Sequence, residues 1–292
     1  KADWEINLGL DNDIFCFNVE SAVELGIINE LAAAKNKVAS IALRINPEVD
    51  AHTHAKITTG MKENKFGINL SQLGGVLDKL KEMKNVKFIG LHFHIGSQIL
   101  DMGDFVALCN RVNELLDKLE ARQIRIEHVN VGGGLGIDYG HPNRQPVPDF
   151  KSYFETYDNC LKLRSYQTLH FELGRSVVGQ CGSLIAKVLY VKQGTNKQFA
   201  ILDAGMTDLI RPALYQAFHK IENITSDAPQ QTYDVVGPIC ESSDVFGKAV
   251  DLNGVKRGDL IALRSAGAYG EIMASGYNCR ELPQGYTSDE LV

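Results

Sequence analysis

Side chains that could do chemistry gather at the ends of apolar runs in this sequence. His92 and His94 close one run, three glycines at 132–134 follow another, and Glu172 with Arg175 follows a third. In α/β proteins, the carboxyl ends of parallel strands meet at one edge, and ligands bind there. The spacing therefore predicts a ligand site at such an edge.

The two histidines allow three interpretations. His92 and His94 are two residues apart, so on a strand their side chains point to the same face. This arrangement fits two hydrogen-bonded core histidines, a ring that stacks on a planar ligand, or a pair of metal ligands. No acidic residue lies nearby at a clear metal-ligand spacing, and we predict no metal site.

The glycine run and the Glu172–Arg175 pair each allow two interpretations. Three glycines let a backbone approach a ligand and offer N–H groups to a phosphate, but they also suit a tight turn. The dinucleotide fingerprint fails, because Ile137 stands where its last glycine would be. Glu172 and Arg175 could form a structural ion pair, or they could anchor a cation and an anion of a ligand.

Three later clusters could also contact a ligand. Cys240 and Glu241 lie among hydroxyl and carboxyl groups, which makes a buried structural thiol less favourable there. Arg211 and Tyr215 are four residues apart and share one face of a helix. Tyr269 stands among small residues, as if its tip had to reach a ligand. A plain packing or surface role also fits the arginine–tyrosine pair and Tyr269.

Periodicity predicts the elements that carry these residues. Short runs rich in Val, Ile and Phe fit buried parallel strands, at residues 14–19, 38–45, 86–94, 124–131 and 168–172. Amphipathic helices are expected between them, at residues 21–34, 104–122 and around 154–161. The first has Val23, Ile27, Leu31 and Ala34 at helical spacing. This alternation indicates a parallel α/β sheet, open or closed into a barrel.

The pattern changes after about Val178. Strands are predicted at residues 184–192, 198–202, 233–236 and 260–264, with one helix over 209–221. We therefore expect an α/β domain over residues 1–178 and a β-rich domain over 179–292.

Composition excludes several classes of protein. The 292 residues are 44% hydrophobic and 23% charged, which is typical of a globular protein and not of a disordered one. A net charge of −6 gives no support for nucleic-acid binding, and no apolar run is long enough for a membrane span. The six cysteines include no C-x-x-C pair, so we expect reduced thiols in a cytoplasmic protein.

Taken together and in order, these segments resemble the diaminopimelate decarboxylase family, in the alanine-racemase-like, fold-type III group of pyridoxal-phosphate enzymes. The resemblance runs from about Ile14 to Arg280. It is carried by His92-Phe93-His94-Ile95-Gly96-Ser97-Gln98, Gly132-Gly133-Gly134, Glu172-Leu173-Gly174-Arg175, Cys240-Glu241-Ser242 and Gly267-Ala268-Tyr269-Gly270, with Arg44-Ile45-Asn46-Pro47 and Asp203-Ala204-Gly205-Met206. It implies decarboxylation of meso-2,6-diaminopimelate to L-lysine and CO2, the last step of lysine biosynthesis.

The resemblance also implies a fold and a cofactor site. The fold would be a pyridoxal-phosphate-binding (β/α)8 barrel, with about five βα units in this chain, followed by a C-terminal β domain. His94 would stack on the pyridine ring, and Glu172 would pair with the pyridinium nitrogen. The phosphate region would be contacted by Ser97, Gly132, Gly133, Gly134, Gly174, Arg175 and Tyr269.

Substrate roles are implied in the same way. Arg175, Arg211 and Tyr215 would hold the distal carboxylate, Glu241 would hold the distal ammonium, and Tyr269 would also line the substrate site. Cys240 would be the acid that returns a proton to the substrate carbon. In the family, Cys240, Glu241 and Tyr269 reach the site from the partner in a homodimer. A plain amine such as ornithine would not need the two arginines, whereas meso-diaminopimelate has a second amino-acid end.

The sequence departs from the family pattern in several places. Leu173, Ser243 and Cys279 stand where the family commonly has Pro, Gly and Ser. No segment matches the Tyr-Ala-x-Lys-Ala-Asn type strand that carries the family's cofactor-binding lysine, so no lysine here is predicted to be catalytic. We expect that lysine and about three βα units to lie outside this chain.

Two alternatives remain open. One is a related fold-type III decarboxylase that acts on carboxynorspermidine or on an acyl-carrier-bound amino acid. The other is a non-catalytic protein that binds pyridoxal phosphate, which the missing lysine suggests. Cys240 and Glu172 favour an enzyme, because a binding module has no use for a proton donor.

Overall fold

The computed structural model describes residues 1–49 and 65–291, which form two compact units. The first unit comprises Lys1–Leu135 and Asp149–Leu173, and the second comprises Gly136–Pro148 and Gly174–Val292. The boundary lies a few residues before the position predicted from the sequence. The segment from Gly136 to Pro148 groups with the second unit, which the sequence did not indicate.

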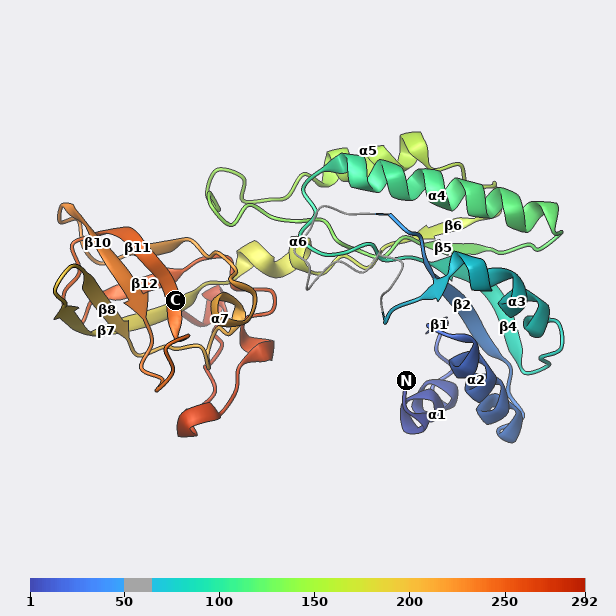
Figure 1. Ribbon diagram of the computed structural model, residues 1–292, viewed down its shortest axis with the longest axis horizontal. Coiled ribbons are helices and arrows are strands. Elements are labelled where there is room, and N and C mark those ends of the chain that lie inside the picture. The colour runs from blue at the N-terminus through green and yellow to red at the C-terminus, as the bar shows by residue number, and fades with distance from the viewer. Residues whose placement is uncertain (50–64, 292) are drawn as a thin grey trace. The chain divides into compact units, whose positions relative to one another are not determined.

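The first unit is built on a parallel sheet with strand order β1-β2-β4-β5-β6 (Figure 1). These strands are β1 (Phe17–Val19), β2 (Ala39–Asn46), β4 (Val86–His92), β5 (His128–Asn130) and β6 (Thr168–His170). The five predicted strands are confirmed, each with shorter or slightly shifted ends. A short strand that was not predicted, β3 (Ile68–Asn69), pairs with β2. In the described residues β1 and β6 are the two ends of this order, so the sheet is open.

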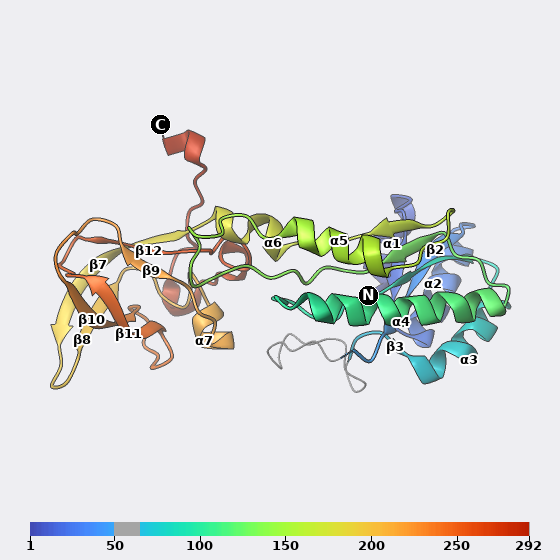
Figure 2. The same cartoon turned by 90° about the horizontal axis from the view of Figure 1, so that it is seen from above.

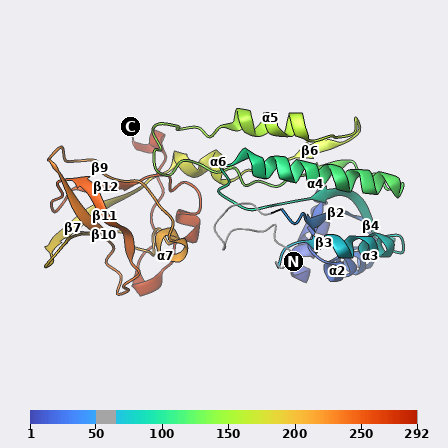
Figure 3. The same cartoon turned by 45° about the horizontal axis from the view of Figure 1, so that its top comes forward.

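The described residues of this unit form five helices: α1 (Asp3–Asp11), α2 (Ala22–Ala34), α3 (Leu70–Leu80), α4 (Met102–Ala121) and α5 (Phe150–Cys160). Helices α4 and α5 lie side by side (Figures 1 and 3). Helix α4 begins after Asp101, whose carboxylate accepts a hydrogen bond from the Gly103 N–H. Its predicted apolar face is confirmed, because Phe105, Leu108 and Val112 are fully buried.

The buried face of α2 differs from the prediction. The helix starts where expected, since the Ser21 hydroxyl accepts a hydrogen bond from the Glu24 N–H at 3.1 Å. Its core contacts come from Leu25, Ile28 and Ala32, whereas the side chain of Val23 is 77% exposed. Apolar residues stand on every side of this helix, so their spacing alone does not select one face.

The second unit holds a mixed sheet with order β11-β10-β8-β7-β12-β9. The strands are β7 (Leu184–Gln193), β8 (Gln198–Leu202), β9 (Ile221–Asn223), β10 (Gln230–Val236), β11 (Val245–Asn253) and β12 (Leu260–Leu263). Strands β8 and β10 pair in parallel, and the other pairs are antiparallel. The six strands are labelled in Figure 2. Strands β9 and β11 also contact each other, so the sheet curls round a core that includes Leu202 and Tyr233.

Two expectations for this unit are corrected. Strands β9 and β11 were not predicted. The helix expected over 209–221 is shorter in the structure, where α7 covers only Arg211–Tyr215. It ends there because Gln216 adopts a left-handed conformation with φ of 55°. The other short helix is α6 (Arg175–Val178), and 3₁₀ turns lie at Gly179–Cys181, Glu271–Met273, Tyr277–Cys279 and Ser288–Leu291. No helix in the described part of the chain has the length and apolarity needed to cross a membrane.

Replacing Leu108 with Ala should lower the free energy of unfolding by about 2–5 kcal/mol, because the side chain is fully buried on α4. The matched control is Val23→Ala on α2, which should change it by less than about 0.5 kcal/mol. Urea denaturation of both variants measures the difference. Equal losses in the two variants would contradict the packing described for α2 and α4.

Candidate active site

The Glu172 carboxylate, just beyond β6, accepts hydrogen bonds from donors on three other strands of the sheet. His92 Nε2 donates to Oε2 at 3.2 Å, and Asn130 Nδ2 donates to Oε1 at 2.9 Å. Asn18 Nδ2 donates to Oε1 at 3.3 Å. These residues come from the ends of β4, β5 and β1, as the parallel order of the sheet requires. Asn18 and Asn130 were not predicted, although each is a lone amide within an apolar run.

These donors keep Glu172 ionised. The hydrogen bond from His92 lowers the pKa of Glu172 to about 2, and it outweighs the opposing effect of partial burial. His92 Nδ1 is buried without a hydrogen-bond partner in the part of the chain that the structure describes. The Glu172 side chain is 44% exposed. The arrangement therefore presents an ionised carboxylate to a ligand.

His94 lies beyond the end of β4 as a neutral ring. Burial, with a smaller contribution from the positive charge of Arg44, lowers its pKa to about 4. Its Nδ1 accepts a long hydrogen bond of 3.4 Å from the Gly133 N–H. Within residues 1–49 and 65–291, no group of three or more His, Cys, Asp and Glu side chains could hold a metal ion.

The glycine turn is required by close packing between strand ends. A Cβ atom on Gly132 would lie 2.4 Å from the Phe93 carbonyl oxygen, and one on Gly133 would lie 2.3 Å from the Glu172 carbonyl oxygen. Gly134 has a φ of 116°, where side chains are strained. The tight-turn interpretation is therefore supported, and the phosphate contact stays a prediction.

Ser97 lies on a loop that is attached to this glycine turn. The Ile99 N–H donates to the Gly134 carbonyl at 2.9 Å. The loop also contains Gln98 in a left-handed conformation, with φ of 63°. Ser97, the glycines, His94 and Glu172 therefore all lie at the carboxyl edge of the first unit's sheet, as predicted.

In the second unit, two buried arginines lie around Tyr139. The exposed fractions of Arg175 and Arg211 are 7% and 6%. Arg175 Nη1 donates to the Tyr139 hydroxyl at 2.5 Å, and the Arg211 guanidinium carbon lies 5.0 Å from the centre of the Tyr139 ring. Arg175 also lies over the ring of Tyr269, at 4.9 Å. Arg175, Arg211 and Tyr269 therefore lie in one cluster with Tyr139. The sequence did not predict that Tyr139 belongs to this cluster.

The charge of Arg211 is poorly compensated by the protein. Burial lowers the pKa of Arg211, and the nearby charge of Arg175 lowers it as well. The phenol groups of Tyr139 and Tyr215 raise this pKa, but by less. The salt bridges between described residues include none to Arg211. A buried cation without a carboxylate favours an anionic ligand. Tyr215, at the end of α7, is close enough to affect this charge.

Cys240 and Glu241 are exposed on the connection between β10 and β11. The Tyr277 hydroxyl donates to Glu241 Oε1 at 2.7 Å, and this bond raises the pKa of Tyr277. The buried Asp244 carboxylate fixes the loop, because it accepts the N–H groups of Met206 and Ile239 at 2.6 and 2.7 Å. The thiol and the Glu241 carboxylate are therefore accessible on a well-defined turn.

Tyr269 has the backbone strain that is common at functional positions. Its φ of 58° places a bulky residue in the left-handed region, at a cost of about 1–3 kcal/mol. Its side chain is nevertheless exposed. Gly174, whose added Cβ would lie 3.9 Å from the Tyr269 hydroxyl, is a neighbour.

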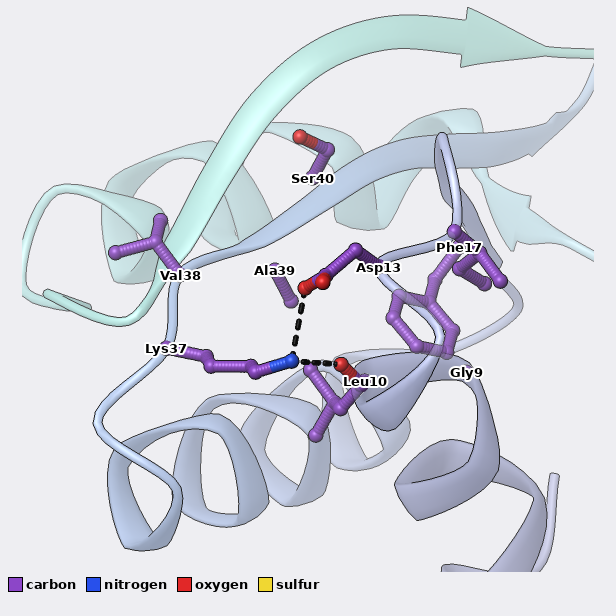
Figure 4. A pocket seen from close by; sticks show the side chains of 9 residues that line it. Gly9, Leu10, Asp13, Phe17, Lys37, Val38, Ala39 and Ser40 are labelled. Atoms are coloured by element: carbon purple, nitrogen blue, oxygen red, sulfur yellow. Dashed lines mark hydrogen bonds and ion pairs between the residues drawn. The ribbon is translucent and has the colours of Figure 1, made fainter.

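A separate pocket of about 280 Å³ lies at the opposite edge of the first unit's sheet, near the start of β2 (Figure 4). Lys37 crosses it and donates to the Leu10 carbonyl at 2.5 Å and to Asp13 Oδ1 at 2.8 Å. Ser40 lines the pocket at the amino end of β2. In barrels this edge contributes to stability and the carboxyl edge to chemistry. We therefore do not place the active site in this pocket.

Comparison with known families gives a match over more than half of the chain. The family model described as "Pyridoxal-dependent decarboxylase, pyridoxal binding domain" matches residues 1–179. A diaminopimelate decarboxylase of Bacteroides thetaiotaomicron is 82% identical over 292 residues, which are 100% of this chain and 76% of that protein. The diaminopimelate decarboxylase of Neisseria meningitidis serogroup B is 44% identical over 96% of this chain and 67% of its own length.

The solved structures to which this chain is similar include diaminopimelate decarboxylases. Diaminopimelate decarboxylase from Helicobacter pylori, complexed with L-lysine, superposes with a TM-score of 0.89 at 40% identity, over 95% of this chain and 69% of that one. The enzyme from M. jannaschii in complex with L-lysine has a TM-score of 0.86 at 38% identity, over 96% and 65% of the two chains.

The ionisation of Glu172 makes a testable contribution to stability. Its pKa is lowered from the ordinary value of 4.5 to about 2, so this contribution is fully present above about pH 4.5 and is lost as the pH falls towards 2. Replacing His92 with Phe should raise the Glu172 pKa towards 4.5. NMR titration of ¹³C-labelled glutamate side chains measures it.

His141→Phe is the control, because it removes an exposed histidine next to a different carboxylate, Asp138. This variant should leave the Glu172 titration unchanged. A Glu172 carboxyl that titrates near pH 4.5 in the unaltered protein would contradict the assigned network.

Proposed function

Because the chain belongs to the diaminopimelate decarboxylase family of pyridoxal-dependent decarboxylases, we propose that it decarboxylates meso-2,6-diaminopimelate to L-lysine and CO2. The observation that carries this substrate is the pair of buried arginines, Arg175 and Arg211, arranged around Tyr139. Two buried guanidinium groups suit a ligand carboxylate. The reaction would be a carbon–carbon bond cleavage in lysine biosynthesis.

Pyridoxal phosphate fits the groups of the first unit. The Glu172 carboxylate is ionised and accessible, so it can pair with a protonated pyridine nitrogen. His94 supplies a neutral ring for stacking, and Ser97 with Gly132–Gly134 would contact the phosphate. When bound, the cofactor supplies an electron sink for the pair that remains after CO2 leaves. Gly174, Arg175 and Tyr269 would complete the phosphate contacts.

The distal amino-acid end of the substrate needs both an anion and a cation from the protein. Arg175 and Arg211, with Tyr215, would bind its carboxylate. Glu241 would bind its ammonium group, and Tyr269 would line the same space. The hydrogen bond from Tyr277 holds Glu241 in one orientation, which supports its role as a fixed anchor.

Cys240 is proposed as the proton donor to the substrate carbon. Its thiol is accessible and lies next to the proposed ammonium anchor, Glu241.

The exposure of Cys240, Glu241 and Tyr269 also supports a homodimer in which these residues reach the partner's site. We propose a cytoplasmic enzyme, which agrees with the six free cysteines.

The substrate proposal predicts release of CO2 from meso-diaminopimelate by the complete protein loaded with pyridoxal phosphate. L-Lysine should form in equal amount, as measured by trapping of labelled CO2 and by amino-acid analysis. Turnover of carboxynorspermidine in place of diaminopimelate would overturn the substrate assignment. Binding of the cofactor with no decarboxylation of either compound would indicate a non-catalytic protein.

Removal of the Cys240 thiol should slow proton return. We expect Cys240→Ala to lower kcat by about 10²-fold or more, with cofactor occupancy unchanged. Cys181→Ala is the matched control, because Cys181 is also an exposed, free thiol of the second unit. If cofactor occupancy collapses in Cys240→Ala while the rate per loaded site is unchanged, the proton-donor role is wrong.

A further inference from the structure

A buried histidine that the proposed reaction does not use makes hydrogen bonds through both of its ring nitrogens. His219 is 1% exposed and lies shortly after α7. Its Nε2 accepts a hydrogen bond from Arg211 Nη1 at 2.8 Å, and its Nδ1 donates to the Arg264 carbonyl at 2.9 Å. The ring therefore links the end of β12 to the guanidinium of Arg211.

This pattern requires a neutral ring with its proton on Nδ1. A proton on Nε2 would point at a cation and abolish the bond from Arg211. The pKa of His219 is lowered to about 4, mainly by burial; the hydrogen bond to the Arg264 carbonyl opposes this, and the charges of Arg211 and Arg175 act in the same direction as burial. His219 is therefore an acceptor for Arg211 throughout the neutral pH range.

The other end of the link is fixed in place. Arg264 Nη1 donates to Glu222 Oε2 at 2.8 Å on β9, and Nη2 donates to Asn143 Oδ1 at 3.0 Å. The Arg264 N–H also donates to the Lys220 carbonyl at 2.8 Å. The carbonyl that holds His219 thus belongs to a residue that three hydrogen bonds tie to two segments of the second unit, residues 220–222 and Asn143.

The ring of Tyr139 also packs against the side chains of His219 and Arg211. Its ring lies 5.2 Å from the His219 ring at an interplanar angle of 78°, and 5.0 Å from the Arg211 guanidinium carbon. Arg211 is therefore in contact with an aromatic face and a hydrogen-bond acceptor, both of them neutral. Neither contact cancels its charge, so the guanidinium is oriented while its attraction for an anion is preserved.

We propose that His219 is a positioning residue that orients Arg211, and so sets the preference of the site for a ligand that carries a distal carboxylate. This inference rests on the proposed function, in which Arg211 binds that carboxylate. A histidine with a packing role alone would affect all ligands equally, whereas a positioning residue affects only ligands that contact Arg211.

Two replacements of His219 separate these roles. In His219→Gln, the side-chain amide oxygen can take the place of Nε2 and accept from Arg211. In His219→Asn, the shorter amide can keep the contact with the Arg264 carbonyl but does not reach Arg211. Arg211→Ala removes the guanidinium itself and shows whether Arg211 binds the ligand at all.

The ligands are L-lysine and cadaverine, which differ only in one carboxylate. Calorimetric titration of the protein loaded with pyridoxal phosphate measures the Kd of each, and cofactor absorbance measures occupancy. We expect His219→Asn to raise the Kd of L-lysine about tenfold, as loss of one charge-assisted hydrogen bond predicts, and to leave cadaverine unchanged. His219→Gln should stay within about threefold of the unaltered protein, and KM for diaminopimelate should follow the same order with kcat little changed.

The outcomes distinguish this inference from the function on which it rests. If Arg211→Ala weakens L-lysine binding and His219→Asn does not, the positioning role is wrong and the proposed substrate anchor stands. Equal losses for L-lysine and cadaverine, or a His219→Gln protein as impaired as His219→Asn, would show a structural role only. If Arg211→Ala leaves L-lysine binding unchanged, the substrate anchor fails and the positioning role fails with it.

Discussion

The carboxylate of Glu172 accepts hydrogen bonds from His92, Asn130 and Asn18, which lie on three different strands. This convergence depends on the parallel register of the sheet, because only then do the carboxyl ends of β1, β4, β5 and β6 meet. It also depends on the glycine turn after β5, where any side chain would separate the strand ends. The ionised state of Glu172, and with it the proposed cofactor contact, follows from these two constraints.

The charged groups of the proposed substrate site in the second unit are buried cations, whereas Glu172 in the first unit is an anion. Arg175 and Arg211 are supported by Tyr139, which lies on the segment from Gly136 to Pro148. That segment directly follows the glycine turn in the chain but packs with the second unit. One stretch of sequence therefore contributes glycines to the proposed cofactor site and an aromatic ring to the proposed substrate site. In each unit, hydrogen bonds orient a charged side chain and leave it available to a ligand.

Much of this arrangement could be predicted from the sequence. The five parallel strands, the face of α4 and the chemical clusters around His94, Glu172 and Cys240 were visible as runs and motifs. The supporting residues were not, because a single polar side chain in an apolar stretch looks the same whether it fills a core or holds a neighbour. Those residues are Asn18, Asn130, Tyr139, His219 and Tyr277. Helix α7 was overestimated because Gln216 ends it through its backbone conformation, for which its residue type gives no signal.

The proposed cofactor site depends on Glu172 being held as a carboxylate for a protonated pyridine nitrogen. The most direct measurement is the ¹⁵N NMR shift of pyridoxal phosphate labelled at that nitrogen and bound to the complete protein. We expect the shift of a protonated pyridine at neutral pH, and the shift of an unprotonated pyridine in Glu172→Gln. An unprotonated nitrogen in the unaltered protein, or a protonated one in both proteins, would contradict it.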